Sequence, residues 1–338
     1  MRFFRKMAAL AAALMLMLTT TANADASRTF FAMDTVMAVS VPDAGEALLS
    51  ACEDEARRLE ALFSVTQPDS EIARLNTDGT VRLSGETETV LTCALEVADL
   101  TGGALDVTLY PVVRAWGFTT GDYRVPDDGE LSALMERVGW EQVVIVDGAA
   151  RVPQGVMVDL GAVAKGYASD RLAALLREGG VSSALIDLGG NIYCVGAKQN
   201  GRPWRIGIRD PKETADYVGA LSVTDRAVVT SGSYERYFTA EDGTVYGHIF
   251  DPATGRPAAS GILSVTVVGE CGLLCDALST ALYVMGVDRA CALLGARADV
   301  DAILVGDDGA LWVTEGLRGA FEPMGPYRQA TIHWIGEE

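Results

Sequence analysis

One short segment, VDLGAVAKG at residues 158–166, has residue types that suit phosphate binding. We expect a strand to end at Asp159, Gly161 to allow a tight turn, and a helix to begin with Lys165 in its first turns. The N–H groups at the start of a helix bind anions, and a lysine adds a full positive charge. Neither the GxxxxGK[ST] nor the GxGxxG pattern is present. A capped helix with a solvated lysine is the alternative interpretation.

A second segment, CDALSTALYVMG at residues 275–286, has hydroxyl and carboxylate groups that suit a divalent cation. Asp276 and Thr280 are four residues apart, so on a helix they project from one face, with Ser279 beside them. Such hard oxygens are the ligands that Mg²⁺ takes, together with waters and substrate phosphates. Alternatively, Asp276 caps the helix and the hydroxyls bond back along it.

Histidine is scarce, because the 338 residues contain only His248 and His333. His248 ends a strand-like segment and precedes the turn signal DPATG at residues 251–255. Imidazole is well suited to moving a proton near neutral pH, although a single histidine can equally be a structural hydrogen-bonding group. His333, in the strand-like TIHWI, has no neighbouring candidate residues, and we interpret it as structural.

A further segment, ALDVTLYPVVRAWGF at residues 104–118, combines a carboxylate with aromatic side chains. Asp106, at an expected strand start, and Trp116 with Phe118 could face a nucleotide or flavin ring. The same residues are equally compatible with a buried turn and a core tryptophan. The segment VTSGSYERYF at residues 229–238 is similar, and packing is its more common role.

Alternating helices and strands must position these residues. The sequence predicts a strand over residues 29–42, a helix over 44–64 capped by Asp43, a polar turn over 65–76 and a helix over 86–103. A helix follows the glycine turn at Gly161. Several consecutive strands then occupy residues 182–269, with a hairpin about Asp242, before a helix over 273–287 and a strand over 301–316. Strands in succession, bracketed by helices, predict an α+β fold of mixed or antiparallel sheets. We expect one domain over residues 25–338, either undivided or in two lobes.

The N-terminus predicts a cleavable export signal over residues 1–24, with Arg2, Arg5 and Lys6 before an apolar run. No lipobox cysteine follows, so we expect an exported, periplasmic or extracytoplasmic protein without a lipid anchor. Without the signal, 24 basic and 46 acidic side chains give a net charge of −22, which argues against nucleic acid as a partner. The spacing of the six cysteines favours buried free thiols.

In this order, the segments resemble the ApbE family of flavin transferases, FAD:protein FMN transferases, from Met33 to about Gly286. The resemblance is carried by these blocks: MDT, SEIARLN, ALDVTLYPVVRAWGF, VDLGAVAKGYASD, LIDLGGNIYCVG, WRIGIRDP, TSGSYERYF, HIFDPATGRP and SVTVVGECGLLCDALSTALYVMG. It implies an ApbE-like domain that uses Mg²⁺ to split FAD. The FMN half would pass to a Thr or Ser hydroxyl of a target protein, and AMP would be released.

The resemblance also implies roles for individual residues. Contacts with FAD would fall on Met33, Ala104, Leu105, Asp106, Asp159, Lys165 and Ile249. The metal contacts would be the Ala162 carbonyl, Asp276 and Thr280, with Ser279 adjacent, and His248 would be the base. The implied partners are FAD and exported or membrane-anchored redox proteins, such as Rnf or sodium-pumping quinone reductase subunits or fumarate-reductase-like proteins.

Two residues depart from the family's usual pattern. Asp34 stands where a glycine is common, and Thr66 stands where a tyrosine is common. An aromatic ring at position 66 would stack on the flavin, which is worth about 1–3 kcal/mol by analogy with nucleic-acid bases. Two alternatives therefore stay open: a Mg²⁺-dependent FAD pyrophosphatase that yields FMN and AMP, and a non-catalytic FAD-binding protein.

Overall fold

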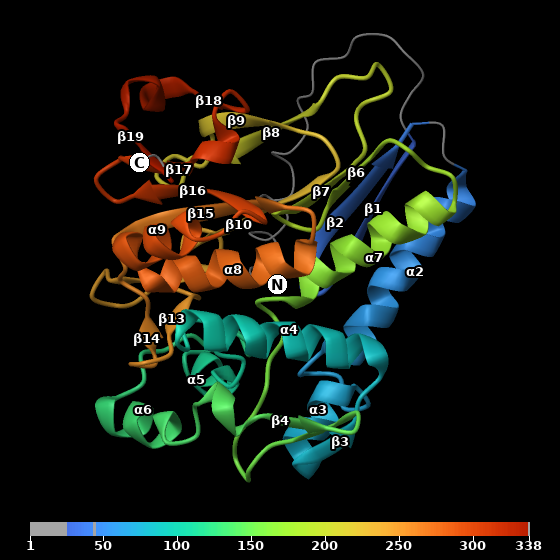
Figure 1. The fold of residues 1–338 in the computed structure, drawn as a ribbon. Coiled ribbons are helices and arrows are strands. Elements are labelled where there is room, and N and C mark those ends of the chain that lie inside the picture. The colour runs from blue at the N-terminus through green and yellow to red at the C-terminus, as the bar shows by residue number, and fades with distance from the viewer. Residues whose placement is uncertain (1–25, 43–44, 337–338) are drawn as a thin grey trace.

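The computed structural model describes residues 26–42 and 45–336, so the expected export signal and the expected helix cap Asp43 lie outside the described residues. Its largest element is a nine-stranded sheet in the upper part of Figure 1, ordered β1-β2-β6-β7-β10-β15-β16-β17-β19. These strands are β1 (Ala26–Ala32), β2 (Thr35–Val41), β6 (Ala184–Asp187), β7 (Asn191–Val195), β10 (Arg226–Gly232), β15 (Ile262–Gly269), β16 (Val300–Gly306), β17 (Leu311–Thr314) and β19 (Ile332–Ile335).

Neighbouring strands of this sheet pair antiparallel, except β17 and β19, which are parallel. The sheet separates two hydrophobic cores, because side chains alternate between its faces. On β10, Ala227 and Val229 enter the main core and Val228 enters the second. The predicted α+β fold with mixed sheets is therefore confirmed.

Helices cover one face of the large sheet and a small sheet covers the other (Figure 1). The helices are α2 (Glu46–Phe63), α7 (Ala164–Glu178), α8 (Gly272–Met285) and α9 (Val287–Gly295). The small sheet, of order β18-β9-β8, consists of β8 (Trp204–Arg209), β9 (Tyr217–Val223) and β18 (Phe321–Pro323). The short 3₁₀ helices η2 (Glu315–Leu317) and η3 (Gly325–Gln329) lie on either side of β18 in the chain.

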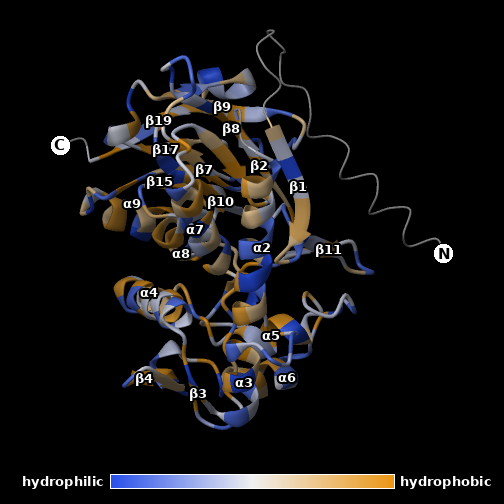
Figure 2. Ribbon diagram, turned by 90° about the vertical axis from the view of Figure 1, so that its right-hand side faces the viewer, coloured by the Kyte–Doolittle hydropathy of each residue, from blue (hydrophilic) through white to orange (hydrophobic). Residues whose placement is uncertain are grey.

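The lower part of Figure 1 is smaller, and α2 runs between the two parts, as Figure 2 shows from the side. It contains α3 (Glu71–Asp78), α4 (Gly85–Thr101), α5 (Tyr110–Ala115), α6 (Asp128–Met135), η1 (Trp140–Gln142), and the sheet of β3 (Thr80–Arg82), β5 (Ala149–Arg151) and β4 (Val144–Val146). Two hairpins pair β11 (Tyr237–Thr239) with β12 (Val245–Gly247), and β13 (Phe250–Asp251) with β14 (Arg256–Pro257). The hairpin predicted about Asp242 is thus confirmed.

Several sequence-based predictions of local structure were wrong, among them the single strand over 301–316, which is the antiparallel hairpin of β16 and β17. The expected strand over 29–42 is a hairpin that turns at Met33 and Asp34, with φ of 49° and 59°. The expected polar turn over 65–76 contains most of α3, because the Ser70 hydroxyl caps that helix by accepting from the Ala73 N–H at 2.9 Å. No strand delivers Asp159 or begins at Asp106, since both lie in irregular segments.

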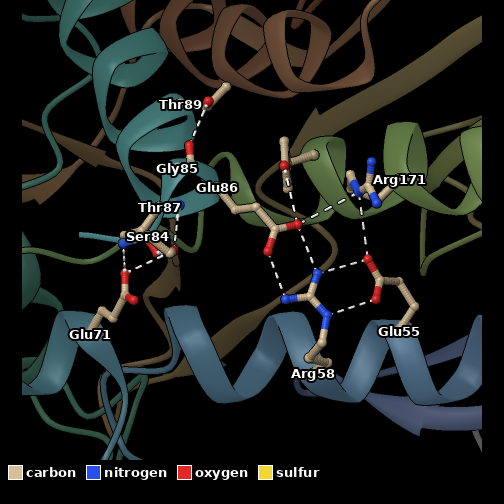
Figure 3. A network of polar contacts seen from close by, with 10 residues as sticks. Glu55, Arg58, Glu71, Ser84, Gly85, Glu86, Thr87, Thr89 and Arg171 are labelled. Atoms are coloured by element: carbon tan, nitrogen blue, oxygen red, sulfur yellow. Dashed lines mark hydrogen bonds and ion pairs between the residues drawn. The ribbon is translucent and has the colours of Figure 1, made fainter. Parts of the chain in front are cut away.

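A cluster of charged side chains joins α2, α4 and α7 (Figure 3). Arg58 of α2 donates two hydrogen bonds of 2.8 Å to Glu55 and two of 2.7 Å to Glu86 of α4. Arg171 of α7 lies 3.5 Å from Glu55 and 3.6 Å from Glu86. Arg58 lowers the pKa of both carboxyl groups, first through these hydrogen bonds. The cluster therefore holds the helix that carries Lys165.

The six cysteines all lie in the described part of the chain and are free thiols. No helix among the described residues has the length and apolarity to cross a membrane.

Candidate active site

Two glycines allow α7 and α8 to cross at close range. A Cβ added to Gly166 would lie 2.6 Å from the Asp276 Cβ and closer still to the Gly272 carbonyl. A Cβ added to Gly272 would lie 2.7 Å from the Gly166 carbonyl. Real side chains do not approach this closely, so the crossing requires both glycines. The first turn of α7, with Lys165, is thereby placed against the first two turns of α8.

Asp170 of α7 fixes the start of α8. Its carboxylate accepts hydrogen bonds from the Gly272 N–H at 2.7 Å and the Leu273 N–H at 2.9 Å. Burial raises the pKa of this carboxyl group, and the two N–H donors oppose that effect. Sequence spacing does not reveal this role of Asp170, because a cap supplied by another helix, 102 residues away, leaves no local signal.

Asp276 faces α7 rather than capping its own helix, whose N-cap is Cys271. Its Oδ2 accepts a hydrogen bond from the Gly166 N–H at 2.8 Å, and the residue is 4% exposed. Burial raises the pKa of Asp276, and the positive charge of Lys165 opposes this. Because Gly166 donates to Asp276, the Ala162 carbonyl four residues earlier accepts no backbone hydrogen bond within the described part of the chain. That carbonyl oxygen is therefore available to a ligand.

Thr280 and Ser279 differ in how the protein uses them. Ser279 is fully buried, donates to the Asp276 carbonyl at 2.9 Å, and lies 2.8 Å from the Ser231 hydroxyl of β10. Thr280 is half-buried, and its hydroxyl lies 3.3 Å from that of Ser231. The Ser279 hydroxyl is thus occupied by hydrogen bonds within the protein. The Thr280 hydroxyl lies at the edge of the face of α8 that carries Asp276.

These oxygen donors are compatible with a magnesium site of the open kind. Among the described residues, no group of three or more His, Cys, Asp or Glu side chains gathers around one point. A cation here would be held by the Asp276 carboxylate, the Thr280 hydroxyl and the Ala162 carbonyl. Mg²⁺ characteristically binds few protein groups and completes its shell with water and substrate oxygens.

Lys165 is the electrostatic centre of the site. Desolvation raises the pKa values of Asp159, Glu235 and Asp276, and the positive charge of Lys165 opposes that rise. Desolvation lowers the pKa of His248, and the charge of Lys165 adds to that lowering. Predicted residues from three separate segments, together with Glu235, therefore lie around one ammonium group. Within the described residues, Lys165 forms no ion pair shorter than 4.0 Å, so it can pair with an anionic ligand.

Glu235 is a residue of this candidate site that the sequence did not predict. Desolvation raises the pKa of Glu235 to about 7, and the charges of Lys165 and Arg209 only partly offset this. Its side chain is nevertheless exposed to solvent and does not belong to the core. A carboxyl group within a segment of aromatic and small residues gave no sequence signal of its own.

His248 immediately follows β12, and the Arg236 carbonyl oxygen fixes its orientation. That oxygen lies 3.1 Å from both the backbone nitrogen and the ring Nδ1 of His248. A carbonyl can only accept, so Nδ1 carries the ring proton and Nε2 keeps a free lone pair. Desolvation, with the charges of Arg236 and Lys165, lowers the pKa of His248 to about 4. The imidazole is therefore neutral near pH 7 and can accept a proton at Nε2.

The Met33 turn lies beside a second glycine loop. A Cβ added to Gly189 would clash with the Thr35 hydroxyl, so the two loops are in close contact. Next to Met33, the Asp34 carboxylate pairs with Arg236 at 2.9 Å. The turn is thereby joined to the residue that orients His248.

The loop at residues 104–107 adjoins Asp159, since the Asp159 N–H donates to the Val107 carbonyl at 2.8 Å. Ala104 and Leu105 are buried. Asp106 accepts from the Thr108 N–H at 2.7 Å, the Thr108 hydroxyl at 2.6 Å and the Trp140 N–H at 3.1 Å. Both of its oxygens are thus engaged in shaping the loop.

Ile249, next to His248, is 8% exposed, and its carbonyl accepts from the Ala258 N–H. Trp116 is fully buried and donates to the Gly255 carbonyl at 3.0 Å. It is therefore a core residue that is hydrogen-bonded to the DPATG turn. His333 stacks on Trp312, with ring centroids 5.2 Å apart, in accordance with its structural interpretation.

Two shallow cavities lie away from these residues. One, of about 440 Å³, is lined by Cys291, Trp312 and Trp334 among others, and the second, of about 530 Å³, lies along residues 76–80 and 151–156. Neither contains a residue of the cluster around Lys165. The candidate site is therefore defined by the charged and hydroxyl side chains around Lys165 and not by either cavity.

Comparison with known proteins agrees with this geometry. The sequence pattern of the ApbE family matches residues 33–304. The chain belongs to the ApbE family. A FAD:protein FMN transferase of Vibrio cholerae is 36% identical over 271 residues, covering 78% of this chain and 80% of the relative. One of Klebsiella pneumoniae is 32% identical over 286 residues, covering 82% and 88%.

Solved structures of the ApbE family have the same fold. The flavin transferase ApbE from Vibrio cholerae superposes with a TM-score of 0.78 at 30% identity, covering 88% of this chain and all of that one. The ApbE protein from Thermotoga maritima gives a TM-score of 0.80 at 32% identity, covering 88% and 99%. The predicted family and the predicted ApbE-like fold are both confirmed.

Proposed function

We propose that the protein transfers the FMN moiety of FAD to a Thr or Ser hydroxyl of a target redox protein and releases AMP. Its curated relatives carry the name FAD:protein FMN transferase. The observation that carries the proposal is the grouping of Lys165, Asp276 and a neutral His248 in one site. Together they supply a cation for the pyrophosphate, a carboxylate for a metal, and a base for the acceptor.

The pyrophosphate of FAD would bind at the start of α7. Lys165 supplies a positive charge there, and the helix start supplies N–H donors. Met33, the loop at Ala104, Leu105 and Asp106, Asp159 and Ile249 are the proposed contacts with the remainder of FAD. Both Asp106 carboxylate oxygens already accept hydrogen bonds within the protein. We therefore expect Asp106 to contribute by fixing the conformation of the loop that would contact FAD.

Mg²⁺ would be held by Asp276, Thr280 and the Ala162 carbonyl, while the adjacent Ser279 hydroxyl donates to the Asp276 backbone carbonyl. When bound, the cation would offset negative charge on the pyrophosphate oxygens. The Gly166 N–H holds the Asp276 carboxylate in place before any ligand arrives. Such preorganisation reduces the reorganisation needed at the moment of reaction.

His248 acts as the general base. Its Nε2 takes the proton of the acceptor hydroxyl as the hydroxyl oxygen attacks the phosphorus of the FMN half. The new O–P bond forms while the bond from that phosphorus to the oxygen of AMP breaks. Proton transfer by a positioned side chain contributes about 10²–10⁴ in rate. The Arg236 carbonyl, by retaining the Nδ1 proton, leaves Nε2 for this role.

A FAD pyrophosphatase is the second candidate, because water could replace the acceptor hydroxyl at the same site. The observation that favours it is Thr66, an exposed residue whose hydroxyl lies 3.0 Å from that of Ser64 and which offers no ring for stacking. The test is to incubate protein, FAD and Mg²⁺ with and without an acceptor protein. Acceptor-dependent AMP release supports transfer; AMP release of equal rate in both samples supports hydrolysis. FAD binding without AMP would leave only a binding protein.

We also propose that the enzyme is exported by a signal cleaved before Asp25. The composition of residues 1–24 supports this. Exported or membrane-anchored flavin-accepting redox proteins would be its partners. Sequencing the N-terminus of protein recovered from the extracytoplasmic fraction tests the cleavage, with an intact Met1 as the contrary outcome.

A further inference from the structure

Asp34 has a backbone conformation that aspartate seldom adopts. Met33 and Asp34 are consecutive non-glycine residues with φ of 49° and 59°. This left-handed region is costly for most side chains and less so for Asp, whose short polar group can bond nearby. The Asp34 carboxylate uses that conformation to reach Arg236, with an Oδ2 to Nη2 distance of 2.9 Å.

Two contacts fix the side chain of Arg236, and its backbone carbonyl in turn fixes His248. The Nη2 that pairs with Asp34 also donates to the Phe118 carbonyl at 3.1 Å. The Arg236 carbonyl accepts from the backbone N–H and from Nδ1 of His248. The Phe118 ring lies 6.3 Å from the imidazole, centroid to centroid. One arginine therefore links the Met33 turn to the catalytic histidine.

The charges that face His248 are both positive. They belong to Arg236 and Lys165, and each disfavours the imidazolium. The Asp34 carboxylate lies directly against the first of them and partly neutralises it. Both partners of this pair are partly exposed, so we expect little effect on the free energy of unfolding. We expect the ion pair to affect the pKa and the tautomer of the His248 imidazole instead.

We propose that Asp34 is a positioning residue for the transfer reaction. It holds Arg236 so that the Arg236 carbonyl keeps the ring proton of His248 on Nδ1 and leaves Nε2 to the acceptor hydroxyl. This inference rests on the proposed function of His248. It assigns a role to a residue that touches neither the expected metal ligands nor the reacting atoms.

The chain allows a direct test, because it contains only two histidines. With ¹⁵N-labelled histidine, an NMR titration reports the tautomer and pKa of His248, and His333 on the far strand β19 serves as an internal reference. The wild type should show the Nδ1–H tautomer. In Asp34→Asn, the unbalanced Arg236 charge should lower the pKa of His248 further, by ~0.5, and the tautomers should become mixed.

Two further variants separate the ion pair from other effects. Asp34→Gly suits the positive φ yet lacks the carboxylate, so it should keep the fold and shift His248 as Asp34→Asn does. Glu322→Gln removes a comparable exposed ion pair, the 2.7 Å contact with Arg205, and should leave both histidines unchanged. An Asp34→Gly protein that is folded but shows the wild-type tautomer and pKa at His248 would overturn the proposal.

Kinetics complete the test. Asp34→Asn should lower kcat about 3-fold to 10-fold with little change in KM for FAD, and Asp34→Glu should recover part of the loss. If His248→Ala keeps full transfer activity, the proposed role of His248 fails regardless of the NMR result. If His248→Ala is inactive but Asp34 variants leave the imidazole and kcat unchanged, only the positioning role fails.

Discussion

The Asp276 carboxylate accepts a hydrogen bond from the backbone N–H of Gly166 at 2.8 Å, across the crossing of α8 and α7. This contact fixes the proposed metal ligand relative to Lys165, the residue before Gly166. It also withdraws that N–H from the Ala162 carbonyl, which becomes a potential ligand. A single interhelical hydrogen bond thus sets the arrangement of the proposed cation site beside the proposed anion site.

The first prediction concerns Asp276→Asn. The amide is nearly isosteric but lacks the negative charge that a divalent cation requires, so turnover should fall at least 10²-fold and should need more Mg²⁺. The measurement is initial rate against Mg²⁺ concentration, with calorimetry of Mg²⁺ binding. In the wild type, chelation should abolish turnover and added Mg²⁺ should restore it. An Asn variant with wild-type Mg²⁺ dependence would remove Asp276 from the site.

The second prediction concerns the helix crossing. Gly166→Ala would force a Cβ to within 2.6 Å of the Asp276 Cβ, so the helices must separate. We expect a loss of about 1–3 kcal/mol in the free energy of unfolding, measured by urea denaturation. Gly85→Ala is the matched control, because its Cβ would meet no atom within 4 Å. Equal stability of the two variants would show that the crossing tolerates a wider spacing.

The third prediction concerns the pH dependence of kcat. His248 must be neutral to accept a proton, and its pKa is lowered to about 4. Activity should therefore persist as the pH falls from 7 to 5 and decline only as the pH approaches 4. An unperturbed histidine, with a pKa near 6.5, would lose activity below about pH 6.5. An acid limb centred near pH 6.5 would contradict the desolvated environment assigned to His248.

The fourth prediction concerns the charged cluster of Figure 3. The pKa of Glu86 is lowered in the folded protein, chiefly by hydrogen bonds from Arg58. Its contribution to stability is thus present above the unfolded-state pKa of about 4.3 and is lost as the pH falls through the folded-state value. Glu86→Gln should cost about 1 kcal/mol at pH 7 and progressively less as the pH falls below the unfolded-state value.

Glu88, in the same turn of α4, is the control for this measurement, because it forms no ion pair with any described residue. Glu88→Gln should change the free energy of unfolding by less than about 0.5 kcal/mol at either pH. If Glu86→Gln costs the same at pH 3 as at pH 7, the loss arises from packing and not from charge.

Much of the site could be predicted from the sequence, because its residues lie in segments with clear local signals. The spacing of Asp276 and Thr280 predicts a shared helix face, which α8 provides. The glycine turn before Lys165 predicts the start of a helix, which α7 provides two residues after Ala162. The DPATG turn likewise follows His248 as expected.

Other features depend on tertiary contacts and left no local pattern. Asp170 caps a helix distant in sequence, and Gly166 is required by the approach of Gly272. Glu235 enters the site only because the chain folds around Lys165. The hairpin at Met33 was missed because Asp34, rather than glycine, occupies a left-handed position. Contacts of this kind follow from the packing of elements and not from residue spacing.

The most direct test of the central claim is the intact mass of an acceptor protein after incubation with the enzyme, FAD and Mg²⁺. A flavin-accepting subunit of a sodium-pumping quinone reductase is a suitable probe. We predict that the acceptor gains the mass of one FMN, on a Thr or Ser, with one AMP released per FMN attached, and that His248→Ala slows this about 10²–10⁴-fold. An acceptor of unchanged mass, with AMP released at the same rate in its absence, would contradict the transferase account.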